Sequence, residues 1–399
     1  MGIYKTFIDG LKDCVDLLGS YETGIIGYFL DLNTGTVNLP PIKISLVAPS
    51  GFGKTTLIST IMKEINVELA SGNVGKRYKM SVRPKEDSDK ARLLECDKKI
   101  DQAIQAGSGK MTTISIAGSG EIARYDFEIV LSTEDERTEL IQPFFIMDIP
   151  GGWIDPRNRV GDINKRWEEF EAHLKDSRIL WIPVDSVALY SARTNSEKEY
   201  RARLLNTTDV ENIAVEWAQS QSDKESCICF APVKCESYHL YEENSRDSKA
   251  TAFRKIFDDM FSGIENTVHK VNPSVRMFYV PVETVGCIKN VTHDWHVGEA
   301  LEFHADYTIT GIRREIKGAD RLLSKVYEYA YEQITDENAK TEKMIEIQEG
   351  KASIFQKSKI VKERKFFEKC KSLLEPIILV FGKYSEDVAN NNRPEEIVV

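Results

Sequence analysis

The chain has 399 residues, 41% of them hydrophobic, and a formal net charge of −10 at pH 7. This length suits one large domain or two ordinary ones, and the acidic balance argues against a broad nucleic-acid-binding surface, which needs clustered Lys and Arg. Seven cysteines without regular spacing predict reduced thiols in the cytosol. No apolar run approaches the ~18 residues of a membrane span, so we expect a cytoplasmic protein without a transmembrane segment.

The first 42 residues predict a leader that packs against the domain that follows. Apolar residues recur at helical spacing over residues 3–19, and residues 25–40 are typical of a strand with a turn at Asn33–Gly35. Pro40 and Pro41 then interrupt regular structure. We therefore expect a leader of one helix and a strand segment over residues 1–42.

Residues 43–60 are the most informative stretch and read K-I-S-L-V-A-P-S-G-F-G-K-T-T-L-I-S-T. An apolar strand pattern, a glycine-rich loop and a helical pattern follow one another, which is the context in which G-x-x-x-x-G-K-[ST] indicates a phosphate-binding P-loop. Lys54 would reach the β- and γ-phosphates, and Thr55 would complete the Mg²⁺ shell. Ala48 replaces the first glycine of the pattern, so it must keep a negative φ. The residues expected to contact nucleotide here are Ser50, Gly51, Phe52, Gly53, Lys54, Thr55 and Thr56.

Two charged stretches, near residues 66–111 and 190–222, predict helical insertions on the surface. The first would carry a thin apolar stripe formed by Leu93, Leu94, Cys96, Ile100 and Ile104. It ends in the glycine-containing loop 107–113, which delivers two threonines. The bland interpretation of such charge runs is a solvated helical face.

Four apolar runs predict further buried strands, at residues 143–148, 179–185, 227–233 and 275–282. Alternation over residues 125–131 predicts a half-buried strand before them. Apolar strands separated by helices are typical of a mostly parallel sheet covered on both faces. The expected fold class is therefore α/β, a three-layer P-loop nucleoside triphosphatase fold.

The C-terminal part predicts a helix at residues 320–334, a charged helical arm at residues 336–384 and a disordered tail at residues 385–399. The arm would dock on the domain or bind a partner.

The strand at residues 143–148 ends in D-I-P-G. Asp148 lies where a P-loop protein needs an acid to hold Mg²⁺, directly or through water. The Gly151 N–H would contact a γ-phosphate and respond to its loss. Together with the P-loop, this motif predicts the second half of a nucleotide site.

An A-x-x-x-x-G-K-T loop followed by D-x-P-G resembles the P-loop GTPases of the translation-factor-related class, including its dynamin-like, Era-like and divergent prokaryotic double-GTPase-like branches. The resemblance covers residues 43–335. It implies a GTPase-like domain that binds GTP and Mg²⁺, and a threonine that contacts both Mg²⁺ and the γ-phosphate. Thr113 is the preferred candidate for that role, with Thr112 as the alternative. Some divergent members belong to bacterial defence or conflict modules.

The guanine-reading N-K-x-D motif of this class follows an apolar strand, where this chain has Val233-Lys234-Cys235-Glu236. Lys234 would lie over the base, and the two oxygens of Glu236 match the two donors of guanine. Val233 replaces the asparagine that braces the loop, so ATP stays possible. The last base-contacting loop would be residues 282–286, with Glu283 and Thr284.

Gly152 and Trp153 stand where many GTPases have a water-orienting glutamine. Phosphoryl transfer depends on positioning and charge stabilisation, so we expect slow turnover unless a partner, a second copy or an arginine such as Arg157 or Arg159 completes the site. The catalytic residues would be Lys54, Thr113, Asp148 and Gly151, with Thr55, Thr113 and Asp148 on the metal.

The predicted function is a Mg²⁺-dependent, slowly GTP-hydrolysing molecular switch that acts on a protein partner or through homo-oligomers. A P-loop ATPase and a nucleotide-binding scaffold without turnover are the alternatives. Two other clusters have plainer interpretations. Residues 293–296, H-D-W-H, predict a polar loop, because their spacing matches no common zinc pattern. Cys227, Cys229 and Cys235 predict core thiols.

Overall fold

The computed structural model describes residues 29–31, 36–38, 41–71, 78–85, 87–105, 111–112, 121–133, 139–221, 225–238, 240, 248–297, 301–351, 361, 364, 368 and 395–396. Thr113 and the helix expected at residues 3–19 lie outside these residues. Among the described residues, no helix is both long and apolar enough to cross a membrane.

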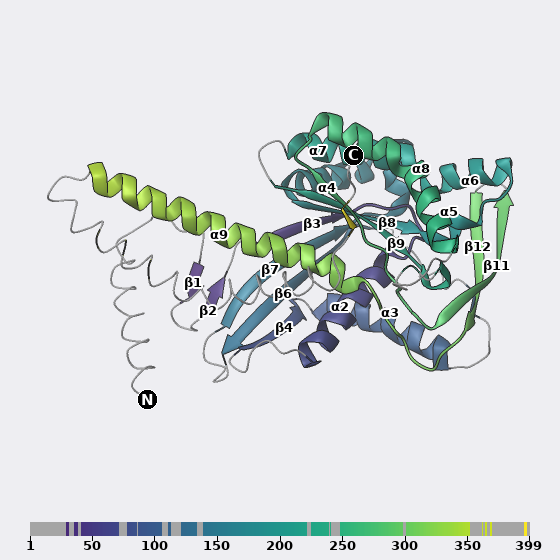
Figure 1. The fold of residues 1–399 in the computed structure, drawn as a ribbon, viewed down its shortest axis with the longest axis horizontal. Helices are drawn as coiled ribbons and strands as arrows, with labels where there is room; N and C mark the ends of the chain where they lie inside the picture. The colour runs from purple at the N-terminus through teal and green to yellow at the C-terminus, as the bar shows by residue number, and fades with distance from the viewer. Residues whose placement is uncertain are drawn as a thin grey trace.

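The fold is α/β, and a β-sheet forms the centre of the molecule (Figure 1). Its main strands lie in the order β6-β7-β3-β8-β9-β10. The five neighbouring strands β7, β3, β8, β9 and β10 are parallel to one another, whereas β6 runs antiparallel to β7. The bounds are β6 Ala123–Thr133, β7 Glu139–Asp148, β3 Ile42–Leu46, β8 Ile179–Asp185, β9 Cys227–Val233 and β10 Arg276–Tyr279. The mostly parallel sheet expected from the apolar runs is confirmed.

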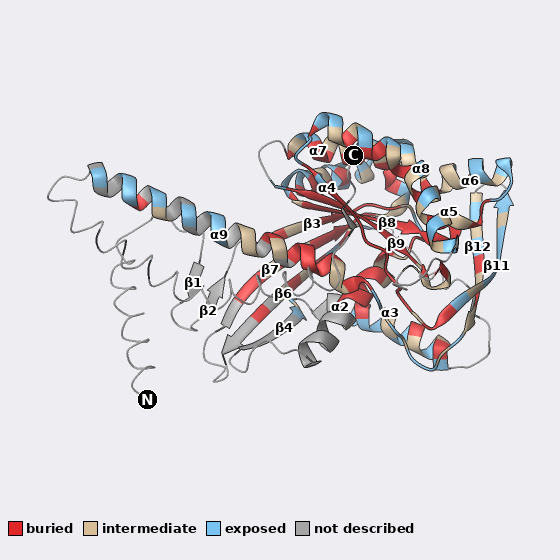
Figure 2. Ribbon diagram, viewed as in Figure 1, coloured by how far each residue is buried: buried red, intermediate tan, exposed pale blue. Residues whose placement is uncertain are grey.

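Helices cover both faces of this sheet. One face packs on α2 (Lys54–Ser71) and α9 (Ala319–Lys351), and the other packs on α4 (Asp162–Asp176), α7 (Thr207–Ser220) and α8 (Ser248–Val271). Successive strand residues point to opposite faces, so Trp181 joins the first core while Leu180 and Ile182 join the second. In Figure 2 the buried residues gather on the central strands and on the first turns of α9.

The carboxyl ends of the strands lead into short local structures. The D-I-P-G segment continues as η1 (Gly151–Ile154) and η2 (Pro156–Asn158), and η3 (Glu236–Tyr238) follows β9. After β8 come α5 (Ser186–Ser191) and α6 (Asn195–Leu205), which begins with a capping box between Thr194 and Glu197.

The predicted insertions are more structured than expected. The first contains a strand, β4 (Tyr78–Pro84), which pairs with β6, followed by α3 (Asp87–Gln105). Within α3 the apolar stripe is buried as predicted except at Leu94, which is 48% exposed. In the second insertion α7 is not a surface helix, because it buries Trp217 completely in the core.

The segment after the last parallel strand was not anticipated. β11 (Ile288–Val297) and β12 (Leu301–Ile309) form an antiparallel hairpin, and β12 pairs with β5 (Met111–Thr112). Residues 293–296 are therefore strand residues of β11 and not a polar loop. Figure 1 shows this hairpin at the end of the molecule away from the distal part of α9.

The ends of the chain also depart from expectation. The boundary predicted at residues 335 and 336 lies inside α9, one continuous helix that extends beyond the sheet in Figure 1. Glu395–Glu396, expected in a disordered tail, form β13 beside β10. In the leader, by contrast, the expected strand segment is found: β1 (Phe29–Asp31) pairs with β2 (Thr36–Asn38), which lies parallel to β7.

Candidate functional site

The predicted motifs meet at the edge of the sheet where the parallel strands end. β3 leads into residues 47–53, β7 ends at Asp148, β8 ends at Asp185, and Lys234 follows β9. Loops at this edge of a parallel sheet are the usual ligand-binding position of open α/β folds. Contacts between these loops, described below, link the predicted motifs to one another.

The glycine-rich loop, residues 48–55, contains two residues whose backbone adopts the left-handed conformation. Gly51 has φ +83° and Gly53 has φ +75°, a region that side chains with a Cβ rarely adopt. Ala48 is not among the described residues with positive φ, as the sequence predicted. The loop closes on α2, because the Leu57 N–H donates to the Gly53 carbonyl at 2.8 Å. Its remaining predicted contact residues differ in exposure: Ser50 is exposed, Phe52 is buried, and Thr55 and Thr56 are half-buried.

The D-I-P-G segment lies directly against this loop. A Cβ added to Gly151 would come within 2.0 Å of the Ser50 nitrogen and 2.3 Å of the Pro49 carbonyl carbon. A Cβ on the next residue, Gly152, would meet nothing within 4 Å. The close approach therefore depends on glycine at position 151 alone.

Lys54 joins the two motifs. Its Nζ donates to the carbonyl oxygens of Ala48 at 2.9 Å and Ile149 at 2.7 Å, and lies 3.3 Å from Asp148 Oδ1. Burial lowers the pKa of Lys54, and the nearby Asp148 carboxylate opposes that shift. The ammonium group therefore lies between the glycine-rich loop and the end of β7, where its polar contacts within the described residues are two main-chain oxygens and one carboxylate.

Asp148 is the buried acid of this pair. The residue is 2% exposed, and its Oδ1 is buried with no hydrogen-bond partner in the described part of the chain, beyond the ion pair with Lys54. Burial raises its pKa to about 6, with Lys54 acting in the opposite direction. A buried carboxylate oxygen of this kind suits a hard cation such as Mg²⁺.

A second lysine contacts the loop from β9. Lys234 adopts φ +58°, and its Nζ donates to the Gly51 carbonyl at 3.2 Å and to Asp185 Oδ2 at 2.5 Å. The other Asp185 oxygen caps α5 by accepting from the N–H groups of Val187 and Ala188, both at 3.0 Å. Asp185 is a site residue that sequence reasoning missed, although an aspartate that ends an apolar strand before a helix was a usable signal.

Glu236 binds the loop predicted to contact the base. Its Oε1 accepts from the Val285 N–H at 2.8 Å, from the Gly286 N–H at 3.2 Å and from Thr284 Oγ1 at 3.5 Å. Its Oε2 is buried and has no partner among the described residues. Burial raises the pKa of this carboxyl, and the backbone donors oppose the rise.

Some predicted residues lie apart from this arrangement. Glu283 is buried, and its carboxylate lies 3.4 Å from Lys317 Nζ. Arg157 pairs with Asp155 at 2.6 Å, and Arg159 stacks 3.3 Å from the centroid of the Trp167 ring. Arg157 is therefore engaged within its own segment, and Arg159 is engaged with α4.

The histidines and cysteines do not form a second site in the described ranges. No group of three or more His, Cys, Asp or Glu side chains in those ranges is arranged to hold a metal ion. That finding does not concern Mg²⁺, which usually takes only one or two carboxylates from the protein. Cys227, Cys229 and Cys235 are buried, as expected of core thiols.

Neither a scan against protein-family models nor a comparison with curated proteins gave a match to this chain. The site is therefore interpreted from its own geometry.

Proposed function

We propose that this protein is a Mg²⁺-dependent, GTP-binding switch that hydrolyses GTP slowly and acts on a protein partner or through a second copy. The observation that carries the proposal is the buried Lys54–Asp148 pair between the glycine-rich loop and D-I-P-G, in which Asp148 Oδ1 lies 3.3 Å from Lys54 Nζ and has no other partner among the described residues. A buried ion pair is costly for stability alone. A phosphate and cation ligand would explain both groups.

The phosphate end would use the loop as a P-loop. Lys54 would exchange its main-chain acceptors for phosphate oxygens, and the N–H groups at the start of α2 would face the same anion. Thr55 and Asp148 would hold Mg²⁺, with Thr113 as a further expected ligand. The ion, when bound, neutralises charge on the phosphate oxygens. Gly151 would report the γ-phosphate, because its backbone already lies against Ser50.

The base end favours guanine. Guanine presents two adjacent N–H donors on its pairing edge, whereas adenine presents an acceptor at the corresponding ring nitrogen. The free Oε2 of Glu236 is an acceptor without a partner in the described structure. A carboxylate at this place would therefore attract guanine and repel adenine.

Slow turnover follows from the residues after Gly151. Trp153 and Ile154 are buried, and neither carries a group that can position water for attack. With Arg157 and Arg159 already engaged, a residue from a partner or a second copy would have to stabilise the transition state.

A P-loop ATPase is the second candidate. The observation that favours it is that Oε1 of Glu236 is already occupied by loop N–H groups, so only one oxygen stays free for the base. A base contacted through main-chain groups alone would not be restricted to guanine.

The test is binding of fluorescent GTP and ATP analogues with Mg²⁺ to the wild type, Lys54→Ala and Glu236→Gln. Glu315→Gln, an exposed neighbour of the base loop, is the matched control. We expect a GTP preference that Glu236→Gln removes and Glu315→Gln keeps, and no binding by Lys54→Ala. Equal affinities of the wild type for GTP and ATP, or a nucleotide preference that Glu236→Gln does not change, would contradict the GTP assignment and favour the ATPase.

A further inference from the structure

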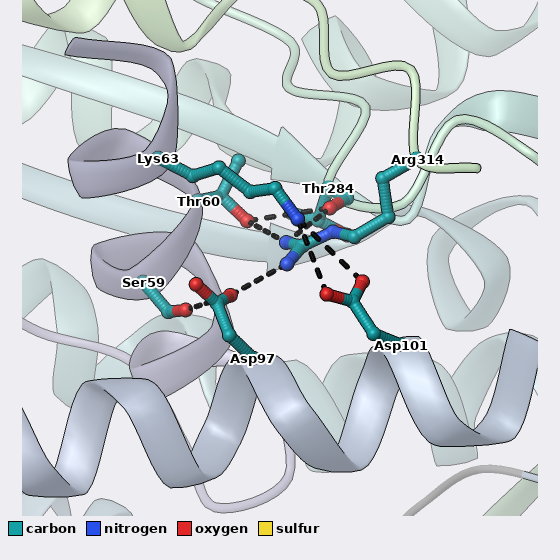
Figure 3. Close-up of polar contacts among 7 residues, drawn as sticks. All are labelled: Ser59, Thr60, Lys63, Asp97, Asp101, Thr284 and Arg314. Atoms are coloured by element: carbon teal, nitrogen blue, oxygen red, sulfur yellow. Dashed lines mark hydrogen bonds and ion pairs between the residues drawn. The ribbon is translucent and has the colours of Figure 1, made fainter. Parts of the chain in front are cut away.

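Arg314 is a buried cation at the back of the loop that Glu236 binds. Its side chain is 1% exposed, and its guanidinium donates to Asp97 Oδ1 at 2.5 Å, to Thr60 Oγ1 at 3.0 Å and to the Thr284 carbonyl at 2.9 Å. Figure 3 shows Arg314 reaching between α2, which carries Thr60, and α3, which carries Asp97. A fully desolvated arginine is costly unless its partners are fixed, so these contacts are specific.

The contact to Thr284 fixes the orientation of one peptide unit. The carbonyl of Thr284 and the N–H of Val285 belong to the same planar trans peptide, so they point in opposite directions. The carbonyl accepts from Arg314 and, at 3.3 Å, from Thr60 Oγ1. The N–H donates to Glu236 Oε1 at 2.8 Å. A cation on the oxygen also polarises the peptide and strengthens the donor on the other side.

The chain around Arg314 follows the base loop closely. Glu315 N–H donates to the Val285 carbonyl at 3.1 Å, and Lys317 and Glu283 exchange backbone hydrogen bonds. Gly286 has φ +75°, and a Cβ there would lie 1.7 Å from the Glu315 carbonyl oxygen. Residues 314–317 and 283–286 therefore form one backbone unit, and Arg314 anchors it to α2 and α3.

From this geometry we infer that Arg314 is a positioning residue for base recognition. It acts through the Thr284–Val285 peptide to fix Oε1 of Glu236, so that the other oxygen of that carboxylate is held in place for the base. This inference rests on the proposed GTP site, and it adds a residue that contacts no nucleotide.

The inference also gives the charged insertion a role. Asp97 is the counter-ion of Arg314 and accepts a further hydrogen bond from Ser59 Oγ at 2.5 Å. One turn further along α2 and α3, Lys63 Nζ forms a second ion pair between the two helices, 3.5 Å from Asp101 Oδ2 (Figure 3). α3 therefore supports the base loop through Arg314 rather than only covering the surface.

The test compares GTP with ITP, which lacks the 2-amino group of guanine. Both nucleotides are titrated with Mg²⁺ into the full-length wild type, Arg314→Lys, Asp97→Asn and the matched control Arg313→Lys, whose side chain is exposed. Lysine keeps the charge but cannot hold Asp97, Thr60 and Thr284 together in one planar fork. We expect the GTP:ITP affinity ratio to fall about tenfold in Arg314→Lys, less in Asp97→Asn and not at all in Arg313→Lys.

The ratio separates positioning from a merely structural role, because loss of folded protein lowers the number of sites and leaves the ratio unchanged. An unchanged ratio in both Arg314→Lys and Asp97→Asn, with Glu236→Gln removing the GTP preference, would overturn the inference and leave the proposed function intact. A wild type without any preference for GTP would instead overturn the proposed function itself.

Discussion

The two ends of the candidate site each hold a buried carboxylate, but they hold it differently. Asp148 faces a lysine side chain, which also donates to two main-chain carbonyls. Glu236 is held by two backbone N–H groups of a loop that is itself anchored by Arg314. A lysine has rotatable bonds and can change partners, whereas a peptide held on both sides cannot. In the proposed site, the phosphate end would therefore rearrange on binding, whereas the base end would already be formed.

Removing the lysine breaks the phosphate end most severely. Lys54→Ala takes away the cation that would bind phosphate and leaves Asp148 as an unpaired buried acid. We expect nucleotide affinity to fall about 100-fold or more, since several charge-assisted hydrogen bonds disappear together. Lys63→Ala on the same helix is the control, because Lys63 forms a partly exposed ion pair with Asp101, away from the glycine-rich loop. Calorimetric titration of both variants with GTP and Mg²⁺ checks this, and tight binding by Lys54→Ala would refute the assignment of the phosphate end.

The close contact behind the lysine can be tested with neighbouring glycines. In Gly151→Ala the added methyl group meets the Ser50 backbone, so the D-I-P-G segment must move away from the glycine-rich loop. We expect a loss of about 1–3 kcal/mol in unfolding free energy from overpacking, together with weaker coupling to the γ-phosphate. Gly152→Ala should change neither, because its methyl group has open space. Thermal unfolding with and without a non-hydrolysable GTP analogue separates the two variants, and equal behaviour would mean that the contact is unimportant.

The difference between the two ends also explains what the sequence could predict. The phosphate end lies in two short local patterns, strand-loop-helix around Lys54 and strand-turn around Asp148, and both were predicted. Lys234 and Glu236 were predicted as base contacts because they stand where the resembled GTPase class has its N-K-x-D motif, and that assignment stays a prediction. Asp185 was missed because its partner, Lys234, follows a different strand. Arg314 was missed because its partners Asp97 and Thr60 lie on helices more than 200 positions earlier in the chain.

The strands that were missed have a similar physical cause. β11 alternates poorly, since most of its residues are exposed. Among the described strands it pairs with β12, which pairs in turn with the short β5. β4 lies in a charged stretch and is a strand because β6 pairs with it, a long-range contact that overrides local preference. Buried strands with both faces apolar were predicted well because their pattern does not depend on distant residues.

A change in pH should act on the base end through Glu236. Burial raises the pKa of this carboxyl, so it takes up a proton closer to neutral pH than an ordinary glutamate does. A protonated Glu236 presents a donor where guanine also presents donors, so we expect the GTP:ATP affinity ratio to fall as the pH falls. Because the folded-state pKa is raised, the same group makes the protein less stable as the pH rises through that window. Titrations of both nucleotides from pH 5 to pH 8 check this, with Glu236→Gln expected to give a flat ratio.

The smallest effect is expected where the two ends meet, at Asp185. Asparagine at this position keeps an oxygen that can cap α5, so Asp185→Asn should unfold at nearly the same temperature as the wild type. It loses the charge that fixes Lys234 against the Gly51 carbonyl, so we expect GTP affinity to fall about threefold to tenfold through a less ordered lysine. Asp176→Asn, which removes a half-exposed partner of Lys43, should leave GTP affinity unchanged. A drop in melting temperature for Asp185→Asn without any change in affinity would show that Asp185 only caps α5, and the two ends would then be independent.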